Sequence, residues 1–476
     1  MARRVDLSKR GTVVLVVLLL LGIAHWNIQT GVEIISLDFP SSFLPPRPEG
    51  DLPVQQRVVN EERDARELDR PVDVDAGSSS ADEVHVVFST GCSPFQDWQS
   101  YLFFHAAWRV GQKGNITRVA SGCGPADAAT LEKSHNEQIR TMSPNFHLHQ
   151  TPDYTNILPG ARYHFFNKAM GIQHWLTHRL RMAENIELYK DTVFVILDPD
   201  QIILRPFVAD YRSETELWSV HDEKIGGPRV IQKGNPMSQE YGIGTRFKRF
   251  INMTYILNST EDSPARHWND SIIRQYYMLG PPYMAVGADF WPLVNTWASF
   301  VRPLHTLSDK AHISEMYAYV TAAAHMNLPH TTGQSFMISN TGSGPGEPWE
   351  WVDRMEDACV VTEPMPHTLH FCQRYFVGPW FFSKYQLPKD FLSCDHPLLA
   401  QPTMKAVDLY PSSTSLDGTV HDQPPKERKR NIFMLCHMIR HLNDAASHYK
   451  RNHCGADANF QRTFMFGDRP LPEDAE

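Results

Sequence analysis

The stretch that decides the fold is Val193-Phe194-Val195-Ile196-Leu197-Asp198-Pro199-Asp200-Gln201-Ile202-Ile203. Its five leading apolar residues predict a buried strand, which runs directly into Asp198 and Asp200. Open α/β sheets bind ligands at the carboxyl ends of their strands, and carboxylates buried there need a partner. Mn²⁺ or Mg²⁺ is a suitable partner because these ions prefer hard oxygen ligands. A plain turn, with one aspartate on each side of Pro199, is the competing interpretation.

Further strands and helices are predicted on the N-terminal side of this stretch. Residues 84–88 and 116–120 are β-favouring runs that end in turn residues, and residues 96–110 between them are long enough for a helix. Apolar residues at helical spacing follow from Phe165 to Leu180. This alternation of strand and helix predicts an α/β fold with a mostly parallel sheet and crossover helices.

Length and composition narrow the classes of protein. The 476 residues, 42% hydrophobic and 21% charged, suffice for one large domain with appendages. With 45 Lys and Arg against 54 Asp and Glu, and no long basic run, nucleic-acid binding is not expected. The 7 cysteines include no Cys-x-x-Cys pair, which argues against a zinc ribbon or a thioredoxin-type site. In an oxidising compartment some of them are expected to pair, and the odd number leaves at least one unpaired.

The N-terminal segment predicts a membrane anchor. A basic cytoplasmic tail, residues 1–10, precedes an apolar run at residues 11–28, which is the pattern of a single-pass type II transmembrane anchor. A cleaved signal peptide is the alternative, although no A-x-A pattern follows the run. Residues 29–83 are rich in Pro, Glu, Asp and Arg, and predict a disordered stem. We therefore expect a membrane location in the Golgi or endoplasmic reticulum, with the remaining chain luminal.

The rest of the chain divides by composition. Residues 84–398 are expected to form the catalytic domain, and the Pro-, Ser- and charge-rich residues 399–430 a loop or linker. The basic block at 426–430 is expected to be solvated surface. Residues 431–476 predict a C-terminal helix and tail, because apolar residues recur along one helical face.

Several short motifs carry a resemblance to one group of enzymes. They are Val86-Val87-Phe88-Ser89-Thr90 with Trp98-Gln99, Asn115-Ile116-Thr117-Arg118, Phe166-Asn167-Lys168 ahead of Trp175-Leu176, Ile196-Leu197-Asp198-Pro199-Asp200, Ile313-Ser314-Glu315-Met316-Tyr317, and His370-Phe371 before Trp380. In their order and spacing the chain resembles the plant and algal hydroxyproline O-arabinosyltransferase and peptidyl-serine α-galactosyltransferase group. The resemblance implies a type II membrane glycosyltransferase with a GT-A-like nucleotide-sugar-binding fold.

The resemblance also implies roles for particular residues. Asp198 and Asp200 would bind the metal and the donor diphosphate, and His370 would be a distant third metal ligand. Arg118, at the end of a predicted strand, would meet the diphosphate. For each residue the plain alternative is a solvated polar side chain or, for His370, a core histidine. The donor-binding residues implied are Thr90, Arg118, Lys168, Asp198 and Asp200.

Two further carboxylates are catalytic candidates on the acceptor side. Glu315 lies in an otherwise apolar helical stretch, residues 313–324, so it either holds the acceptor hydroxyl or pairs with a basic residue. Asp289 is the second candidate, and the aromatic residues that follow it can stack on sugar or proline rings. Because the resembling families retain the anomeric configuration, the leaving phosphate can act as the base.

The expected function is transfer of a sugar, with arabinofuranose favoured, from a UDP-sugar to hydroxyproline or a hydroxyproline-linked glycan on secreted proteins. The expected cofactor is Mn²⁺ or Mg²⁺. Peptidyl-serine α-galactosyl transfer is the alternative within the group. A catalytically silent luminal protein that binds a glycan or peptide is the alternative of another class. A glycosidase would require two carboxylates about 5–10 Å apart, a separation that sequence does not give.

Overall fold

A computed structural model of the chain describes residues 84–158, 160, 162–214, 228–243, 256, 263–307, 311–342, 346–362, 364–414 and 420–464. Within these residues, none of the helices is long and apolar enough to cross a membrane. This finding overturns the prediction of a single-pass membrane location in the Golgi or endoplasmic reticulum. The predicted tail, anchor and stem, residues 1–83, lie outside the described residues.

The central sheet of the described chain has 7 strands in the order β3-β2-β1-β4-β7-β6-β8. β7 runs antiparallel to both of its neighbours, and the other adjacent pairs are parallel. The prediction of an α/β fold with a mostly parallel sheet is therefore confirmed. The strands are β1 (Val84–Gly91), β2 (Asn115–Ser121), β3 (Phe146–Thr151), β4 (Val193–Leu197), β6 (Met237–Glu240), β7 (Leu279–Val286) and β8 (Thr331–Gly333).

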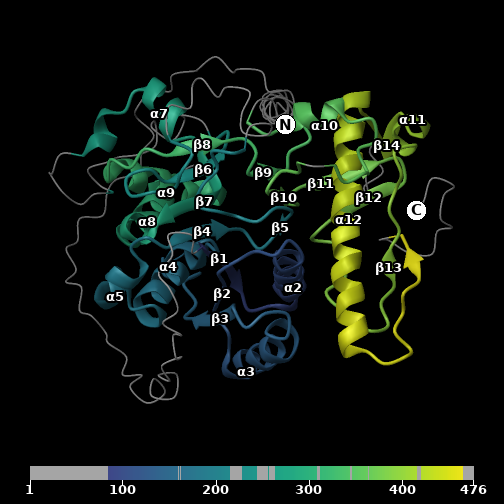
Figure 1. Cartoon of the computed structure of the whole chain (residues 1–476), viewed down its shortest axis with the longest axis horizontal. Helices are drawn as coiled ribbons and strands as arrows, with labels where there is room; N and C mark the ends of the chain where they lie inside the picture. Colours follow the sequence, from purple (N-terminus) through teal and green to yellow (C-terminus); the bar gives the residue numbers. More distant parts are fainter. Residues whose placement is uncertain are drawn as a thin grey trace, which may run out of the picture. The chain divides into compact units, whose positions relative to one another are not determined.

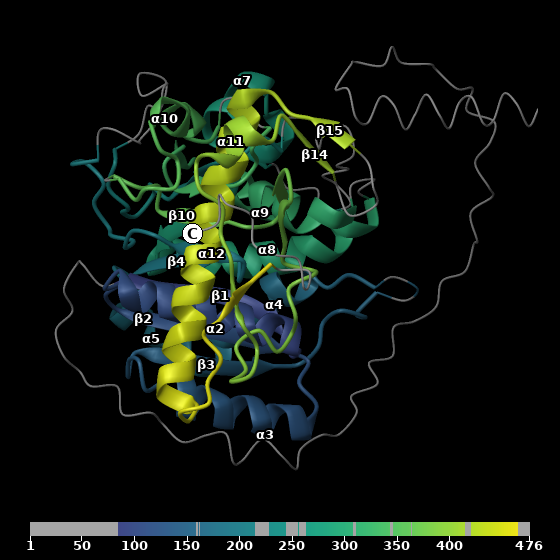
Figure 2. The same cartoon turned by 90° about the vertical axis from the view of Figure 1, so that its right-hand side faces the viewer.

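Helices cover both faces of this sheet (Figures 1 and 2). On one face lies α2 (Pro94–Arg109), and the long helix α12 (Pro425–His453) packs on its outer side. On the other face lie α4 (Phe166–His174), α8 (Gly287–Leu307) and α9 (Ser314–His325). The remaining helices are α3 (Pro125–Ser134), α5 (Met182–Tyr189), α7 (Asp270–Tyr276), α10 (Trp349–Arg354) and α11 (Ala406–Leu409).

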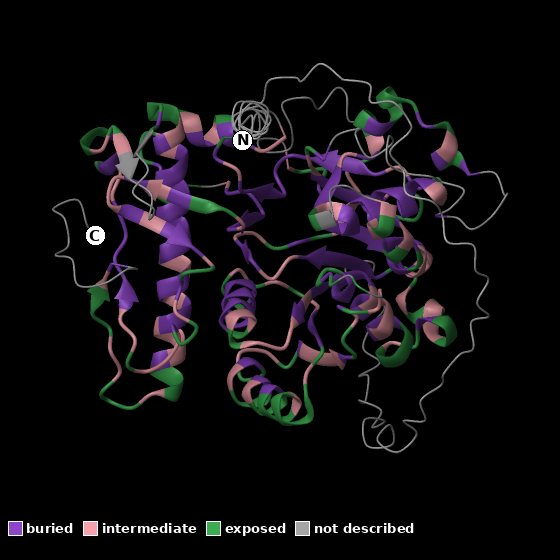
Figure 3. Ribbon diagram, turned by 180° about the vertical axis from the view of Figure 1, so that it is seen from behind, coloured by how far each residue is buried: buried purple, intermediate pink, exposed green. Residues whose placement is uncertain are grey.

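The side chains of the central strands explain this layering. Val86 and Phe88 of β1 belong to the core beneath α2, whereas Val87 between them belongs to the core beneath α4. Alternate residues of a strand point to opposite faces, so a strand covered on both faces must be apolar throughout. All five residues of β4 are buried for this reason, and Figure 3 shows buried residues concentrated in the central strands.

Short strands extend the fold beyond the carboxyl edge of the sheet. The chain leaves β4, turns at Pro199 and enters β5, which pairs antiparallel with β10, and β10 in turn pairs parallel with β9. A hairpin of β11 and β12 follows β10 directly. These strands are β5 (Gln201–Ile203), β9 (Met337–Ile338), β10 (Thr368–His370), β11 (Arg374–Val377), β12 (Trp380–Ser383), β13 (Leu398–Leu399), β14 (Ser412–Thr414), β15 (Val420–Asp422) and β16 (Arg462–Thr463).

The C-terminal helix begins earlier than the sequence predicted. α12 starts at Pro425, so the basic block forms its first turns, and Arg428 and Arg430 are buried. Arg430 donates Nε and Nη2 to the Asp353 carboxylate at 2.9 and 2.7 Å, and Arg428 donates Nε to the Val407 carbonyl at 2.8 Å. The expectation of a solvated block is therefore wrong for these two arginines, because the short helices α10 and α11 pack against this end of α12.

Six of the cysteines form disulfides: Cys92–Cys123, Cys359–Cys436 and Cys394–Cys454. The first joins the segments that follow β1 and β2, and the other two join α12 and its end to the preceding loops. Cys372 forms no disulfide with a described residue, which agrees with the expected unpaired thiol.

Candidate active site

The Asp198-Pro199-Asp200 turn lies at the carboxyl edge of the sheet, as predicted. The Asp198 backbone N–H donates to Gln201 Oε1 at 2.8 Å, and Gln201 Nε2 donates to Thr368 Oγ1 at 3.3 Å. These bonds tie the turn to β10, in which His370 lies directly opposite Gln201. The pairing of β5 with β10 therefore carries His370 to the side of Asp200, across a long interval of sequence.

Asp198, Asp200 and His370 form the one group of potential metal ligands found among the described residues. Their ligand atoms all lie within 4.8 Å of one another, and His370 Nε2 is 3.2 Å from Asp200 Oδ1. Two carboxylates and an imidazole are a donor set that suits Mn²⁺ and accommodates Mg²⁺. The residues present therefore fit the predicted divalent cation.

Two lysines form ion pairs with the aspartates. Lys168 Nζ lies 2.8 Å from Asp198 Oδ1, and Lys384 Nζ forms a close ion pair with Asp200 Oδ2. Burial would raise the pKa of Asp200, but His370 and Lys384 outweigh it and hold that pKa well below its usual value. Lys384, just after β12, was not predicted from sequence, because nothing near it marks a site.

The protonation of His370 bears on metal binding. Burial opposes the charged imidazolium, but Cys372 and Asp200 beside it raise the pKa of His370 well above its ordinary value. A histidine binds a metal through a neutral ring nitrogen, so loading the site would release a proton. His370 Nδ1 faces Met337 Sδ at 3.2 Å, which leaves Nε2 on the side of Asp200.

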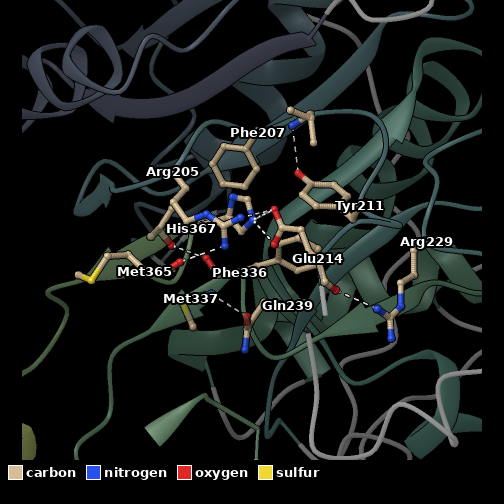
Figure 4. Close-up of polar contacts among 12 residues, drawn as sticks. Arg205, Phe207, Tyr211, Glu214, Arg229, Gln239, Phe336, Met337, Met365 and His367 are labelled. Atoms are coloured by element: carbon tan, nitrogen blue, oxygen red, sulfur yellow. Dashed lines mark hydrogen bonds and ion pairs between the residues drawn. The ribbon is translucent and has the colours of Figure 1, made fainter. Parts of the chain in front are cut away.

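A partly buried ion-pair network lies at the far end of the β5–β10 pair (Figure 4). Glu214 accepts from Arg205 Nη2 at 2.6 Å and lies 3.0 Å from His367 Nε2. Burial would raise the pKa of Glu214, but His367 and Arg205 lower it. The backbone N–H of Leu204 also donates to the His367 carbonyl at 2.8 Å. The network thus fixes the chain three residues before His370.

Lys168 connects the aspartate turn to Glu315 on α9. Its Nζ lies 3.4 Å from Glu315 Oε1, and all but a few per cent of both side chains is buried. Burial raises the pKa of Glu315 to about 7, Asp198 adds to the rise, and Lys168 opposes it. The Tyr163 hydroxyl accepts from the Glu315 backbone N–H at 3.0 Å. Of the two interpretations of Glu315 left open by the sequence, pairing with a basic residue is observed.

Thr90 near the end of β1 and Arg118 in the middle of β2 form a neighbouring cluster. Arg118 Nε donates to Thr90 Oγ1 at 2.9 Å, and Arg118 Nη2 lies 2.8 Å from Asp97 Oδ1 on α2. β1 pairs with β4 through Phe88 and Leu197, so Thr90 lies level with the aspartate turn. Arg118 is thus satisfied within the described chain, and its contact with a diphosphate stays a prediction.

Asp289 lies apart from these groups, in the first turn of α8. Its Oδ2 accepts from the Gly234 backbone N–H at 2.6 Å. Within the described residues no ion pair joins Asp289 to the aspartate turn or to Glu315. Because Val286 at the end of β7 pairs with Val193 at the start of β4, Asp289 lies at the opposite edge of the sheet from the aspartate turn, which argues against its predicted acceptor-side role.

Comparisons with known proteins identify relatives by sequence. No protein-family model matches the chain. A peptidyl serine alpha-galactosyltransferase of Arabidopsis thaliana is 25% identical over 402 residues, which cover 81% of this chain and 40% of the relative. A protein of the same name from Chlamydomonas reinhardtii is 25% identical over 289 residues, covering 55% of this chain and 32% of the relative. The chain thus matches less than half the length of these curated relatives.

Comparisons with solved structures give weaker likenesses. A galactosyltransferase, LgtC, in complex with donor and acceptor sugar analogues matches with 11% identity and a TM-score of 0.32, over 61% of this chain and 87% of that one. The bifunctional glycosyltransferase WbbM matches with 10% identity and a TM-score of 0.32, over 62% of this chain and 47% of that one. These TM-scores are too low to support a conclusion. The sequence relatives, by contrast, fall in the plant and algal group that the motifs resemble, so that resemblance is confirmed.

Proposed function

We propose that the chain is a metal-dependent glycosyltransferase with a GT-A-like fold that transfers a sugar from a UDP-sugar to a peptide hydroxyl. The observation that carries the proposal is the convergence of Asp198, Asp200 and His370 at the carboxyl edge of a mostly parallel sheet. The names of the curated relatives favour α-galactosyl transfer to serine over the predicted arabinofuranosyl transfer to hydroxyproline.

The proposed roles follow from charge and position. A divalent cation held by Asp198, Asp200 and His370 would offset the charge of the leaving diphosphate. Lys384 binds a phosphate oxygen once it leaves Asp200, because its ammonium stands at the same edge. Lys168 keeps Asp198 and Glu315 in place at 2.8 and 3.4 Å. Thr90 near the end of β1 and Arg118, which bonds to it, line the nucleotide side of this edge.

The proposed reaction exchanges one glycosidic bond for another. The bond from the anomeric carbon to the UDP oxygen breaks, and a bond to the acceptor oxygen forms. The acceptor proton passes to the departing phosphate, so no strong side-chain base is required. Glu315, with a pKa raised to about 7, is assigned to substrate binding beside the reacting carbon.

The test is sugar transfer by the purified full chain, with Mn²⁺ or with EDTA. The donors are UDP-galactose, UDP-arabinofuranose and UDP-glucose, and the acceptors are serine-rich and hydroxyproline-rich peptides. We expect metal-dependent transfer of galactose to the serine peptide. Asp200→Asn should abolish it, whereas Asp191→Asn, on the exposed turn before β4, should not.

The outcomes separate the candidate functions. Transfer of arabinofuranose to hydroxyproline would keep the enzyme class and reverse the assigned specificity. A folded chain that binds neither Mn²⁺ nor UDP, and transfers no sugar, would contradict the proposal and favour a binding scaffold.

A further inference from the structure

Two polar atoms beside Lys168 are buried without a hydrogen bond. Neither the Tyr283 hydroxyl nor Glu315 Oε1 has a hydrogen-bond partner among the described residues. Tyr283 is 0% exposed and Glu315 is 4% exposed. Glu315 Oε1 instead faces Lys168 Nζ at the ion-pair distance of 3.4 Å.

Both atoms lie on the same side of the aspartate turn. Tyr283 on β7 is directly opposite Ile196 on β4, two residues before Asp198. Its ring faces the layer of α4, α8 and α9, from which Lys168 and Glu315 also come. Lys168 Nζ lies 5.6 Å from the centre of the Tyr283 ring. β7, α4, α9 and the turn after β4 thus bring Tyr283, Lys168, Glu315 and Asp198 together around the Lys168 ammonium.

The electrostatics agree with this proximity. Burial raises the pKa of the Tyr283 phenol, and the carboxylates of Glu315 and Asp198 raise it further. The phenol therefore keeps its proton and is available as a hydrogen-bond donor, whereas an ionised carboxylate only accepts.

Unmade hydrogen bonds of this kind call for a ligand. Buried polar groups are nearly always hydrogen-bonded, because the loss of water is otherwise uncompensated. A hydroxyl group complements both atoms, because it can accept a hydrogen bond from the phenol and donate one to the carboxylate. Sugars are rich in hydroxyls, and Lys168 joins this group to Asp198, where the proposed metal and diphosphate bind.

We propose that the Tyr283 hydroxyl and the Glu315 carboxylate bind one hydroxyl group of the donor sugar, so that Tyr283 is a specificity-determining residue. This inference rests on the proposed function. The donor sugar is favoured over the acceptor because Lys168 links both residues to Asp198, the proposed ligand of the metal and the donor diphosphate. An ordered water that satisfies the same two atoms is the other source of a hydroxyl, and the test distinguishes it.

The chain offers a matched pair of tyrosine variants for the test. The rings of Tyr283 and Tyr319 stack with their centres 3.8 Å apart, but the Tyr319 hydroxyl has a partner, His330 Nε2, at 3.1 Å. Tyr319→Phe should lower the melting temperature and leave the preference for the donor sugar unchanged. Tyr283→Phe should leave the melting temperature unchanged or higher, since it removes a hydroxyl with no bond in the described chain.

The decisive measurement is binding of UDP and of the best UDP-sugar donor to each variant, by titration with Mn²⁺ present. Tyr283→Phe should bind UDP normally and the UDP-sugar about tenfold more weakly, which is the loss of one hydrogen bond. Donor analogues that each lack one sugar hydroxyl then locate the contact. One of them should bind the wild-type chain about tenfold more weakly than the parent donor, and bind Tyr283→Phe no more weakly than wild type.

Each other outcome overturns the inference. If Tyr283→Phe raises only the KM of the acceptor, the hydroxyl comes from the acceptor. If it lowers the melting temperature without changing donor affinity, the two atoms hold an ordered water. Failure of the wild-type chain to bind UDP would remove the proposed function as well, so the two failures are distinguishable.

Discussion

Glu315→Gln should stabilise the chain at high pH and leave it nearly unchanged at low pH. The substitution keeps the size of the side chain and removes its ionisation. In the folded chain the pKa of Glu315 is raised from 4.5 to about 7, first by burial and then by Asp198. Between these two values the unfolded chain releases the proton and the folded chain keeps it, so rising pH lowers the free energy of unfolding.

The size of the effect follows from the same values. The difference between the folded and unfolded pKa corresponds to about 3 kcal/mol. The free energy of unfolding falls by this amount as the pH rises from 4.5 to about 7, and Glu315 causes no further change above that pH. At about pH 4 the carboxyl is neutral in both states, and the wild type should differ from Glu315→Gln only by the cost of fitting the amide. At about pH 8 the free energy of unfolding of the variant should exceed that of the wild type by up to about 3 kcal/mol more than it does at about pH 4.

The assay is urea unfolding of the full chain, followed by tryptophan fluorescence at both pH values. At each pH the free energy of unfolding of the wild type is subtracted from that of the variant. The change in this difference between the two pH values is the measured quantity, because the effects of other titrating groups cancel in it. Glu184→Gln, at an exposed position on α5, is the control and should show no such change. An equal difference at both pH values would refute the reasoning, since it would mean that Lys168 fully compensates the burial of Glu315.

Three further changes have defined outcomes. Asp200→Asn should abolish Mn²⁺ binding and transfer while the melting temperature changes by only a few degrees; unfolding of the variant in a thermal melt would instead make the aspartate structural. Lys384→Met should weaken UDP binding about tenfold, because a phosphate contact is lost. It should strengthen Mn²⁺ binding in the absence of UDP, because the Lys384 ammonium no longer competes for Asp200. Titration calorimetry measures both affinities, and weaker Mn²⁺ binding would contradict this account. Arg430→Met should cost about 2 kcal/mol in urea unfolding, since it removes two charge-assisted hydrogen bonds from the largely buried Asp353 carboxylate and leaves it to the exposed Lys426, and should leave the KM of the donor unchanged; a loss below about 0.5 kcal/mol would show that the pair is not stabilising.

The sequence predicted those parts of the site that depend on local pattern. The apolar run at residues 193–197 and the aspartates after it place the turn at the edge of a covered strand, because strand periodicity and burial are local properties. The alternation of strands and helices predicted the parallel part of the sheet for the same reason. His370 came instead from the resemblance, since only the pairing of β5 with β10 brings it to Asp200.

The rest of the site depends on contacts between distant residues. Lys384 and Tyr283 carry no local signal, and they reach the aspartate turn through a hairpin and an antiparallel strand. Arg118 was predicted at a strand end but lies in the middle of β2, and sequence does not reveal that Asp97 on α2 meets its guanidinium. The buried arginines of α12 were expected in solvent because the short helices that pack against them are distant in sequence.

The position of α12 has a consequence for biosynthesis. α2 follows the first strand of the described domain, yet its outer side is covered by residues near the end of the chain. Tyr101 bonds to His448 at 2.8 Å, and Arg109 pairs with Asp444. While the ribosome is still making the middle of the chain, the apolar flank of α2 has no native cover and needs shelter from association with other chains. A chain truncated before residue 425 would therefore be bound by chaperones or degraded by proteases, even though its aspartate turn is present.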